Sequence, residues 1–337
     1  MIINKKSSLI LILKVLEEYT DEDHLLTQQQ IIDKISQLYN IDLERKSVSN
    51  SISLLIELGY DIVSIPRKGY CLLSRLFDDS EITFLIDAIF SSKSISGKQA
   101  EQLANKCSSI LSKYKRKNYS YLYKSEEINR TENKDVFLTI EIISEAIKNK
   151  KCISFQYLSY DENCKLNYRY NGYRYIVSPY YLINNFGRYY LICHRKKYNK
   201  IINFRVDYIK NVEIIDKEYI DIKTLEEYKN GFSISNYLND HIYVFGGEII
   251  KAKFLINNPA SISYIVDWFK DNAKIYQEDN KIYAEIKCNE NALYYWYMQY
   301  NEHFIIIEPI SLIERVKKSA EDILNKIGAV KKYNFRK

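Results

Sequence analysis

Residues 43–73 read LERKSVSNSISLLIELGYDIVSIPRKGYCLL. The first part repeats apolar residues at helical spacing, on a face formed by Val48, Ile52, Leu55 and Ile56. Gly59 is suited to end this helix, because glycine tolerates the left-handed conformation found just past helix ends. Two short β-type runs then flank Pro66–Gly69, a turn signal. This stretch therefore predicts a helix followed by a two-stranded hairpin.

The residues upstream predict two more helices. Residues 6–19 and 28–39 carry apolar side chains at the same helical spacing, and Thr27 is a suitable N-cap for the second of them. Three helices and a hairpin within residues 1–75 predict a winged helix-turn-helix, whose third helix would enter the major groove of DNA.

The third predicted helix and the hairpin turn carry groups that a DNA contact needs. Short hydrogen-bonding and cationic side chains line the outer face of the helix, and two cations lie at the turn. The residues predicted to contact DNA are Thr27, Gln28, Arg45, Lys46, Ser47, Ser49, Asn50, Ser53, Arg67 and Lys68. Residues 1–75 hold 9 Lys/Arg and 10 Asp/Glu, with the acids gathered around Glu17–Asp23, so this domain is not basic overall. An ordinary amphipathic helix with a solvated polar face is the alternative.

Positive charge is concentrated in the middle of the chain, although the net charge is only +6. Residues 146–210 hold 13 Lys/Arg and 3 Asp/Glu, and residues 163–206 hold nine basic residues, nine tyrosines and no carboxylate. Cations for phosphates and aromatic rings for stacking are what a nucleotide or a single strand requires. A metal-dependent nuclease is disfavoured here, because it needs carboxylates to hold its ions. The alternative is a β-domain with half-buried tyrosines and solvated lysines.

The 337 residues are enough for several domains, and the patterns predict a multidomain α+β protein. Residues 76–133 are predicted to be a helical connector. Residues 134–215 begin with a helix and continue as short strands, which a small, strongly bent antiparallel barrel accommodates. Residues 216–247 are predicted to be a linker, and residues 248–337, where strands and helices alternate, an α/β module.

The sequence lacks motifs for catalysis, metal binding and membrane insertion. Its six cysteines are far apart and its four histidines are scattered, so we predict no metal site, no cofactor and no enzymatic activity. No segment reaches the ~18 consecutive apolar residues of a membrane span. The start lacks a signal-peptide cleavage pattern, and we therefore expect a cytoplasmic protein.

Several further motifs occur in a recognisable order. They are LERKSVSNSISLLIELGYDI at 43–62, SEITFLIDAIFSSKSIS at 80–96, then ISFQY, VSPYYL, RYYLICH and INFRVDYI within 153–209. FGGEIIKAKFLI, WFKDNAKI and IIIEPISLIERV follow within 245–316. With these motifs the chain resembles bacterial transcription factors of the WYL-domain class over nearly its whole length. The triplet that names the family reads Tyr189-Tyr190-Leu191 here, so a tyrosine replaces its tryptophan.

The resemblance implies a winged helix-turn-helix, a helical connector, an Sm-like β-barrel that senses a ligand, and an α/β C-terminal extension. It also implies a nucleotide or nucleic-acid-derived ligand bound by Tyr157, Arg188, Tyr189, Tyr190, His194, Arg195 and Arg205. Arg205 offers a bidentate fork to a phosphate, but a structural pair with Asp207 is the alternative. Leu191 points away from the face of Tyr190 and is assigned to the core.

We therefore expect a DNA-binding transcriptional regulator whose barrel ligand modulates operator binding. The expected form is a homodimer on an inverted repeat. The alternative is an RNA- or ssDNA-processing factor that uses the basic barrel directly, since catalytic groups can assemble from distant positions.

Overall fold

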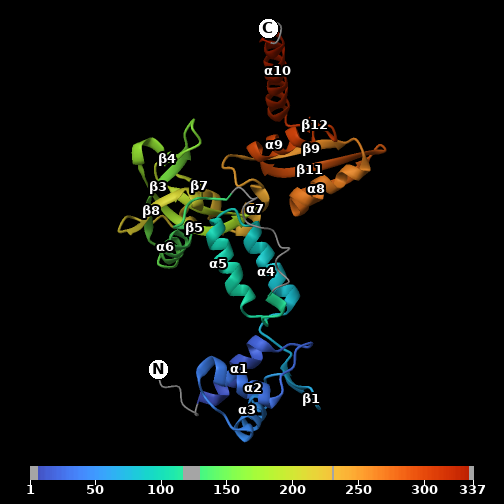
Figure 1. Cartoon of the computed structure of the whole chain (residues 1–337). Helices are drawn as coiled ribbons and strands as arrows, with labels where there is room; N and C mark the ends of the chain where they lie inside the picture. The colour runs from blue at the N-terminus through green and yellow to red at the C-terminus, as the bar shows by residue number, and fades with distance from the viewer. Residues whose placement is uncertain (1–6, 117–129, 230, 334–337) are drawn as a thin grey trace. The chain divides into compact units, whose positions relative to one another are not determined.

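The computed structural model describes residues 7–116, 130–229 and 231–333, and Figure 1 shows their helices and strands. The chain forms two compact units, residues 1–134 and 135–337. Both contain helices and antiparallel strands, as expected for the α+β class. Within the described ranges, no helix is both long and apolar enough to cross a membrane.

Residues 1–75, called the head below, contain three helices and a hairpin. They are α1 (Ser8–Tyr19), α2 (Gln28–Tyr39), α3 (Arg45–Glu57) and the antiparallel pair β1 (Ile62–Ile65) and β2 (Gly69–Leu72). Their apolar faces share one core, in which Leu16, Ile31, Ile35 and Leu55 are fully buried. The predicted apolar face of α3 is confirmed except at Ile56, which is 48% exposed because it lies at the edge of the helical stripe.

Two local features define the ends of these elements. Thr27 accepts a hydrogen bond from the backbone N–H of Gln30, whose side chain accepts one from the N–H of Thr27. This capping box confirms the predicted start of α2. Gly69 has a φ of +120°, and a Cβ there would lie 2.3 Å from the carbonyl oxygen of Leu26. Glycine is therefore required where β2 passes the Leu26–Tyr70 bridge.

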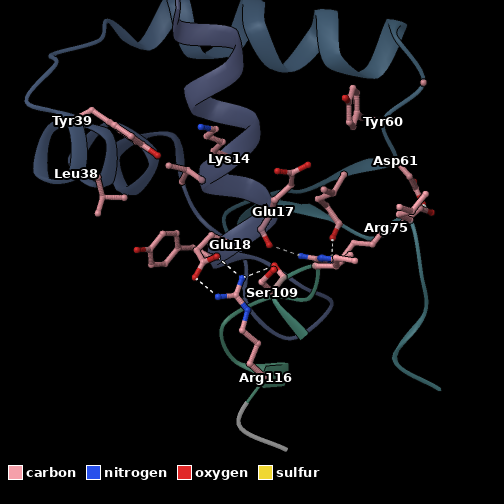
Figure 2. A pocket seen from close by; sticks show the side chains of 17 residues that line it. Lys14, Glu17, Glu18, Leu38, Tyr39, Tyr60, Asp61, Arg75, Ser109 and Arg116 are labelled. Atoms are coloured by element: carbon pink, nitrogen blue, oxygen red, sulfur yellow. Dashed lines mark hydrogen bonds and ion pairs between the residues drawn. The ribbon is translucent and has the colours of Figure 1, made fainter. Parts of the chain in front are cut away.

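The connector contains α4 (Asp79–Ser91) and α5 (Gly97–Ser108), and the residues after α5 return to the head. Arg116 pairs with the carboxylate of Glu18, and Arg75 donates to the backbone carbonyl of Glu17. Both arginines line a hollow of about 830 Å³ between the head and the end of α5. Their side chains are labelled in Figure 2. The part of the predicted connector at 117–129 lies outside the described residues.

The second unit opens with α6 (Val136–Lys148) and six strands. The strands are β3 (Cys152–Tyr160), β4 (Leu166–Tyr168), β5 (Arg174–Asn185), β6 (Arg188–Arg195), β7 (Lys200–Arg205) and β8 (Ile209–Ile215). They pair in the order β4-β3-β5-β6-β7, and β8 also pairs with β3. Phe155, Leu191 and Val206 pack against α6 in a shared core, so the assignment of Leu191 to the core is confirmed.

The segment predicted to be a linker, residues 216–247, contains regular structure in its described residues 216–229 and 231–247. They include α7 (Ile234–Asp240), whose Tyr237 is buried and exchanges hydrogen bonds with Asn203 of β7. The hydroxyl of Tyr180 donates to the backbone carbonyl of Ile220. Apolar side chains of this segment pack on β5 and β6, and it therefore covers one face of these strands.

The last module alternates strands and helices. Its elements are β9 (Ile249–Ile256), α8 (Ile262–Phe269), β10 (Ala273–Glu278), β11 (Lys281–Asn289), α9 (Glu290–Tyr300), β12 (Phe304–Glu308) and α10 (Ile310–Tyr333). The antiparallel sheet has the order β10-β11-β9-β12. Phe254 of the sheet packs with Phe269 of α8 and Trp296 of α9, so both helices cover the same face.

Candidate nucleic-acid interface and ligand site

The outer face of α3 is exposed, as a DNA contact requires. Ser47 is half-buried, and the exposed residues of this face are Arg45, Lys46, Ser49, Asn50 and Ser53. Arg67 and Lys68 are exposed at the tip of the β1–β2 hairpin, while Thr27 and Gln28 are half-buried at the start of α2. All ten residues predicted to contact DNA are therefore at least partly accessible.

A groove of about 470 Å³ lies between the start of α2, the start of α3 and the β1–β2 hairpin. Its lining includes Thr27, Gln28, Arg45 and Arg67. Within it, Arg45 donates to Oε1 of Gln29 at 3.1 Å, and Gln28 donates to the hydroxyl of Tyr70 at 3.2 Å. The sequence did not single out Gln29 or Tyr70, because no local pattern signals contacts between residues 16 or 42 positions apart. These two side chains orient two of the predicted DNA contacts.

In the second unit, two arginines converge on one buried carboxylate. Asp207 is 1% exposed, and Arg205 binds it through Nε to Oδ1 at 3.1 Å and Nη2 to Oδ2 at 2.6 Å. Arg188 adds a bond from Nη1 to Oδ2 at 3.1 Å. The Arg205–Asp207 pair that the sequence offered as an alternative is therefore present. Arg188 also binds Asp207, which was not predicted.

Aromatic rings surround this cluster, called the Asp207 cluster below. Tyr190 lies directly opposite Arg205 in the β6–β7 pairing, so the two side chains share a face. The guanidinium of Arg205 lies 4.0 Å from the ring centroid of Tyr208. Burial lowers the pKa of Arg205, but the hydrogen bonds and charge of Asp207 outweigh it and raise this pKa above its ordinary value. The cluster therefore keeps the Arg205 cation beside two half-buried phenol rings, those of Tyr190 and Tyr208.

Tyr157 contacts the backbone of the Asp207 cluster at Arg205. Its hydroxyl accepts a hydrogen bond from the backbone N–H of Arg205 at 3.1 Å, and its ring packs edge-on against Phe204. Burial raises the pKa of this phenol, and the hydroxyl therefore stays protonated. Tyr157 positions the strand that carries Arg205.

His194 belongs to a different hollow. It is 1% exposed, its Nε2 lies 3.1 Å from Oδ1 of Asn199, and it lines a hollow of about 270 Å³ with Cys152 and Ser178. Because an amide oxygen only accepts, Nε2 carries the proton in this contact. Among the described residues, Nδ1 has no hydrogen-bond partner.

The remaining predicted ligand residues on β6 point to the other face of the strand. Tyr189 packs against the core, and Arg195 lies over the rings of Tyr173, Tyr175 and Tyr198 at 4.8–5.6 Å. Of the seven predicted ligand residues, the structure therefore brings Arg188, Tyr190 and Arg205 together, with Tyr157 beneath them. It places Tyr189, His194 and Arg195 elsewhere.

Residues 163–206 contain no carboxylate themselves, but the fold brings carboxylates from later residues next to them. Arg205 and Arg188 pair with Asp207, Arg174 with Glu213 at 3.0 Å, and Lys196 with Glu218 at 2.6 Å. These carboxylates follow residues 163–206 in sequence and reach them through the fold. The positive surface is consequently divided into separate small sites.

Comparisons with known proteins identify one part of the chain. Residues 139–214 match the family model "WYL domain". Among solved structures, proteasome accessory factor B/C (PafBC) of Arthrobacter aurescens is 14% identical with a TM-score of 0.30, covering 92% of this chain and 47% of its own. The chain thus spans about half the length of that protein. A CRISPR Cas-related protein is 16% identical with a TM-score of 0.37, covering 95% of this chain and 84% of its own. No curated protein matches the chain.

Proposed function

Residues 139–214 of this chain are a WYL domain, and from that premise we propose that the protein is a DNA-binding transcriptional regulator. Its head acts as a winged helix-turn-helix, and the strands of the WYL domain form an Sm-like barrel that binds a nucleotide or nucleic-acid-derived ligand. Ligand binding changes the affinity for the operator, an inverted repeat bound by a homodimer in the cytoplasm. The role is regulatory and not catalytic.

One observation carries the DNA-binding part of this proposal. The exposed face of α3, the start of α2 and the cationic hairpin turn meet at one groove, which includes Arg45 and Arg67. In a winged helix-turn-helix, α3 would read the major groove while the hairpin turn contacts the backbone. The distribution of charge supports this orientation, because the acids of the head at Glu18, Asp21 and Glu22 are bound by Arg116, Ser112 and Lys115.

The Asp207 cluster supports the ligand-binding part. Arg188 is 22% and Arg205 24% exposed at the side chain, so both remain accessible while Asp207 orients them. The net charge of the two arginines and Asp207 is positive. A phosphate can therefore accept hydrogen bonds from the guanidinium N–H groups that Asp207 does not engage, next to the phenol of Tyr190.

The DNA-binding part is tested with duplexes selected by the full chain from a random-sequence pool. Arg45→Ala is expected to weaken binding about tenfold, which is about 1.4 kcal/mol, because it removes a charged contact from the reading face. Lys98→Ala removes an equal charge from an exposed position of α5 and serves as the control. Equal losses in both variants would contradict a specific role of the head.

The ligand-binding part is tested with a short 5′-phosphorylated oligonucleotide added to the complex with duplex DNA. We expect it to change duplex affinity about 5- to 150-fold, and we expect Arg205→Ala to remove this response while preserving affinity without the oligonucleotide. Loss of duplex binding itself in Arg205→Ala would place the WYL domain at the DNA interface. Turnover of a nucleotide that His194→Ala abolishes would support the alternative of a processing factor.

A further inference from the structure

The sheet of the C-terminal module has one face that its helices leave open. Ala252, Phe254 and Ile256 of β9 point into the core with Ala284 and Ile286 of β11. Because side chains alternate along a strand, their neighbours in sequence point to the opposite face. The side chains of the open face are Lys251, Lys253 and Leu255 of β9, Lys274, Tyr276 and Glu278 of β10, Lys281, Tyr283, Glu285 and Lys287 of β11, and Ile305 and Glu308 of β12.

An aromatic and apolar row crosses all four strands of this face. Tyr276 pairs with Tyr283, Tyr283 with Leu255, and Leu255 with Ile305. The two tyrosine rings are stacked with centroids 5.8 Å apart, and Ile305 is 48% exposed. Three strand spacings of ~4.8 Å make the row about 14 Å long. A row of this kind on a four-stranded sheet can stack two or three bases.

The charges of the open face are distributed unevenly. Five lysines and three glutamates lie on it. Lys251 and Lys287 are direct cross-strand neighbours, an arrangement that is unfavourable without an anion nearby. Asp240 pairs with Lys287 at 2.9 Å, whereas Lys251 has no ion-pair partner in the part of the chain that is described.

A hollow lies at this positive end of the face. Its volume is about 410 Å³, and its lining includes Lys251, Lys253, Lys274 and Lys287 together with Asp271, Glu285 and Glu308. The hollow therefore adjoins the tyrosine row, since Lys253 lies 4.6 Å from the ring centroid of Tyr283.

We propose that this open face binds single-stranded DNA, with bases stacked on Tyr283 and Tyr276 and a phosphate held between the cross-strand neighbours Lys251 and Lys287. Stackable rings beside a strip of ammonium groups match the alternation of base and phosphate along a single strand. A duplex is disfavoured, because its bases are already stacked and cannot reach the rings. The choice of DNA over RNA rests on the proposed function, in which the same chain binds DNA through its head.

The test measures binding of a fluorescein-labelled oligo(dT) of about 15 nucleotides to the full chain by fluorescence anisotropy. Tyr283→Leu keeps an apolar strand residue but removes the ring, and we expect affinity to fall at least about fivefold. Tyr295→Leu, on an exposed tyrosine of α9, is the matched control and should bind as the unmodified chain does.

A second pair of variants tests the phosphate contact. Lys251→Ala is expected to reduce the slope of log affinity against log salt by about 0.7, as loss of one phosphate contact on a single strand does. Lys318→Ala removes an exposed lysine of α10, which is not part of the open face, and should leave the slope unchanged.

To exclude a contribution of the Asp207 cluster, the measurements are repeated in an Arg188→Ala/Arg205→Ala/Asp207→Asn background, in which no buried carboxylate is left without its partners. Unchanged affinity in both Tyr283→Leu and Lys251→Ala would overturn the proposal, whatever the head does with duplex DNA. It would also be overturned if Tyr283→Leu altered the mass in sedimentation but not oligo(dT) binding, because the face would then be an interface between copies of the chain. Loss of duplex binding in Arg45→Ala concerns only the proposed function.

Discussion

Ser112 donates a hydrogen bond to the carboxylate of Asp21 across 2.6 Å, and both side chains are buried at 2% exposure or less. Nδ1 of His24 lies 2.6 Å from the other oxygen of Asp21, and its ring stacks on Tyr114 at 3.6 Å. Residues 17–24 and 112–116, called the joint below, therefore connect the head to the segment after α5. Figure 2 shows the Glu18–Arg116 pair of this joint. The joint makes the position of the head depend on residues far outside it.

Replacing Asp21 should loosen the joint. Asp21→Asn removes the charge that Ser112 and His24 bind. We expect the free energy of local unfolding of α1 to fall by about 1–3 kcal/mol, the cost of leaving buried partners unsatisfied. The measurement is hydrogen-exchange protection of α1 in the full chain. Asp23→Asn, at an exposed neighbour, is the control, and equal loss of protection in both variants would refute the role of Asp21.

The contribution of Asp21 should also depend on pH. Burial raises the pKa of this carboxyl, but hydrogen bonds from Ser112, His24 and the N–H of Asp23 outweigh it and hold the pKa below the ordinary 3.8. A lowered pKa in the folded state stabilises the fold above the unfolded value and ceases to do so as pH falls through the folded value. The difference in protection between the unmodified chain and Asp21→Asn should therefore be constant above about pH 5 and shrink below about pH 4. A difference that grows on acidification would contradict this assignment.

The hairpin of the head should be sensitive to Gly69. Both Gly69 and Gly59 have positive φ, but only at Gly69 would a Cβ meet backbone, 2.3 Å from the carbonyl oxygen of Leu26. Gly59→Ala should cost about 1 kcal/mol from backbone strain. Gly69→Ala should cost more and weaken duplex binding, because the hairpin must move away from Leu26. Thermal unfolding and duplex affinity of the two variants provide the check, and equal effects would speak against the close approach.

The Asp207 cluster should be a stability element as well as a site. Asp207→Ala leaves two half-buried guanidinium groups facing each other. We expect the free energy of unfolding to fall by an amount near the lower end of the range of about 3–5 kcal/mol, because both arginines retain contact with water. Urea unfolding of the full chain, followed by a signal from the second unit, measures this loss. Lys196→Ala breaks the solvent-exposed pair with Glu218 and should cause no measurable change. If the two variants were equally stable, Asp207 would not organise the arginines.

Several elements of this protein were predictable from the sequence because their signals are local. The helical spacing of apolar residues predicted α2 at 28–39 with its Thr27 cap, and the alternation of strand side chains placed Leu191 in the core. The match of residues 139–214 to a WYL domain agrees with the motifs found within 153–209. Each of these features depends on residues a few positions apart, whose relative placement the regular backbone determines.

Only the tertiary structure decided which charged groups meet. Glu18 and Arg116 are 98 positions apart, and Lys196 meets Glu218 across 22. The sequence alone therefore showed a head that is not basic overall and an acid-free basic window, whereas the fold shows that several of these charges are paired with groups elsewhere in the chain. Ion pairs form between surfaces that the packing of whole elements brings together, and that packing is driven by apolar burial, which carries no information about the charges at its rim.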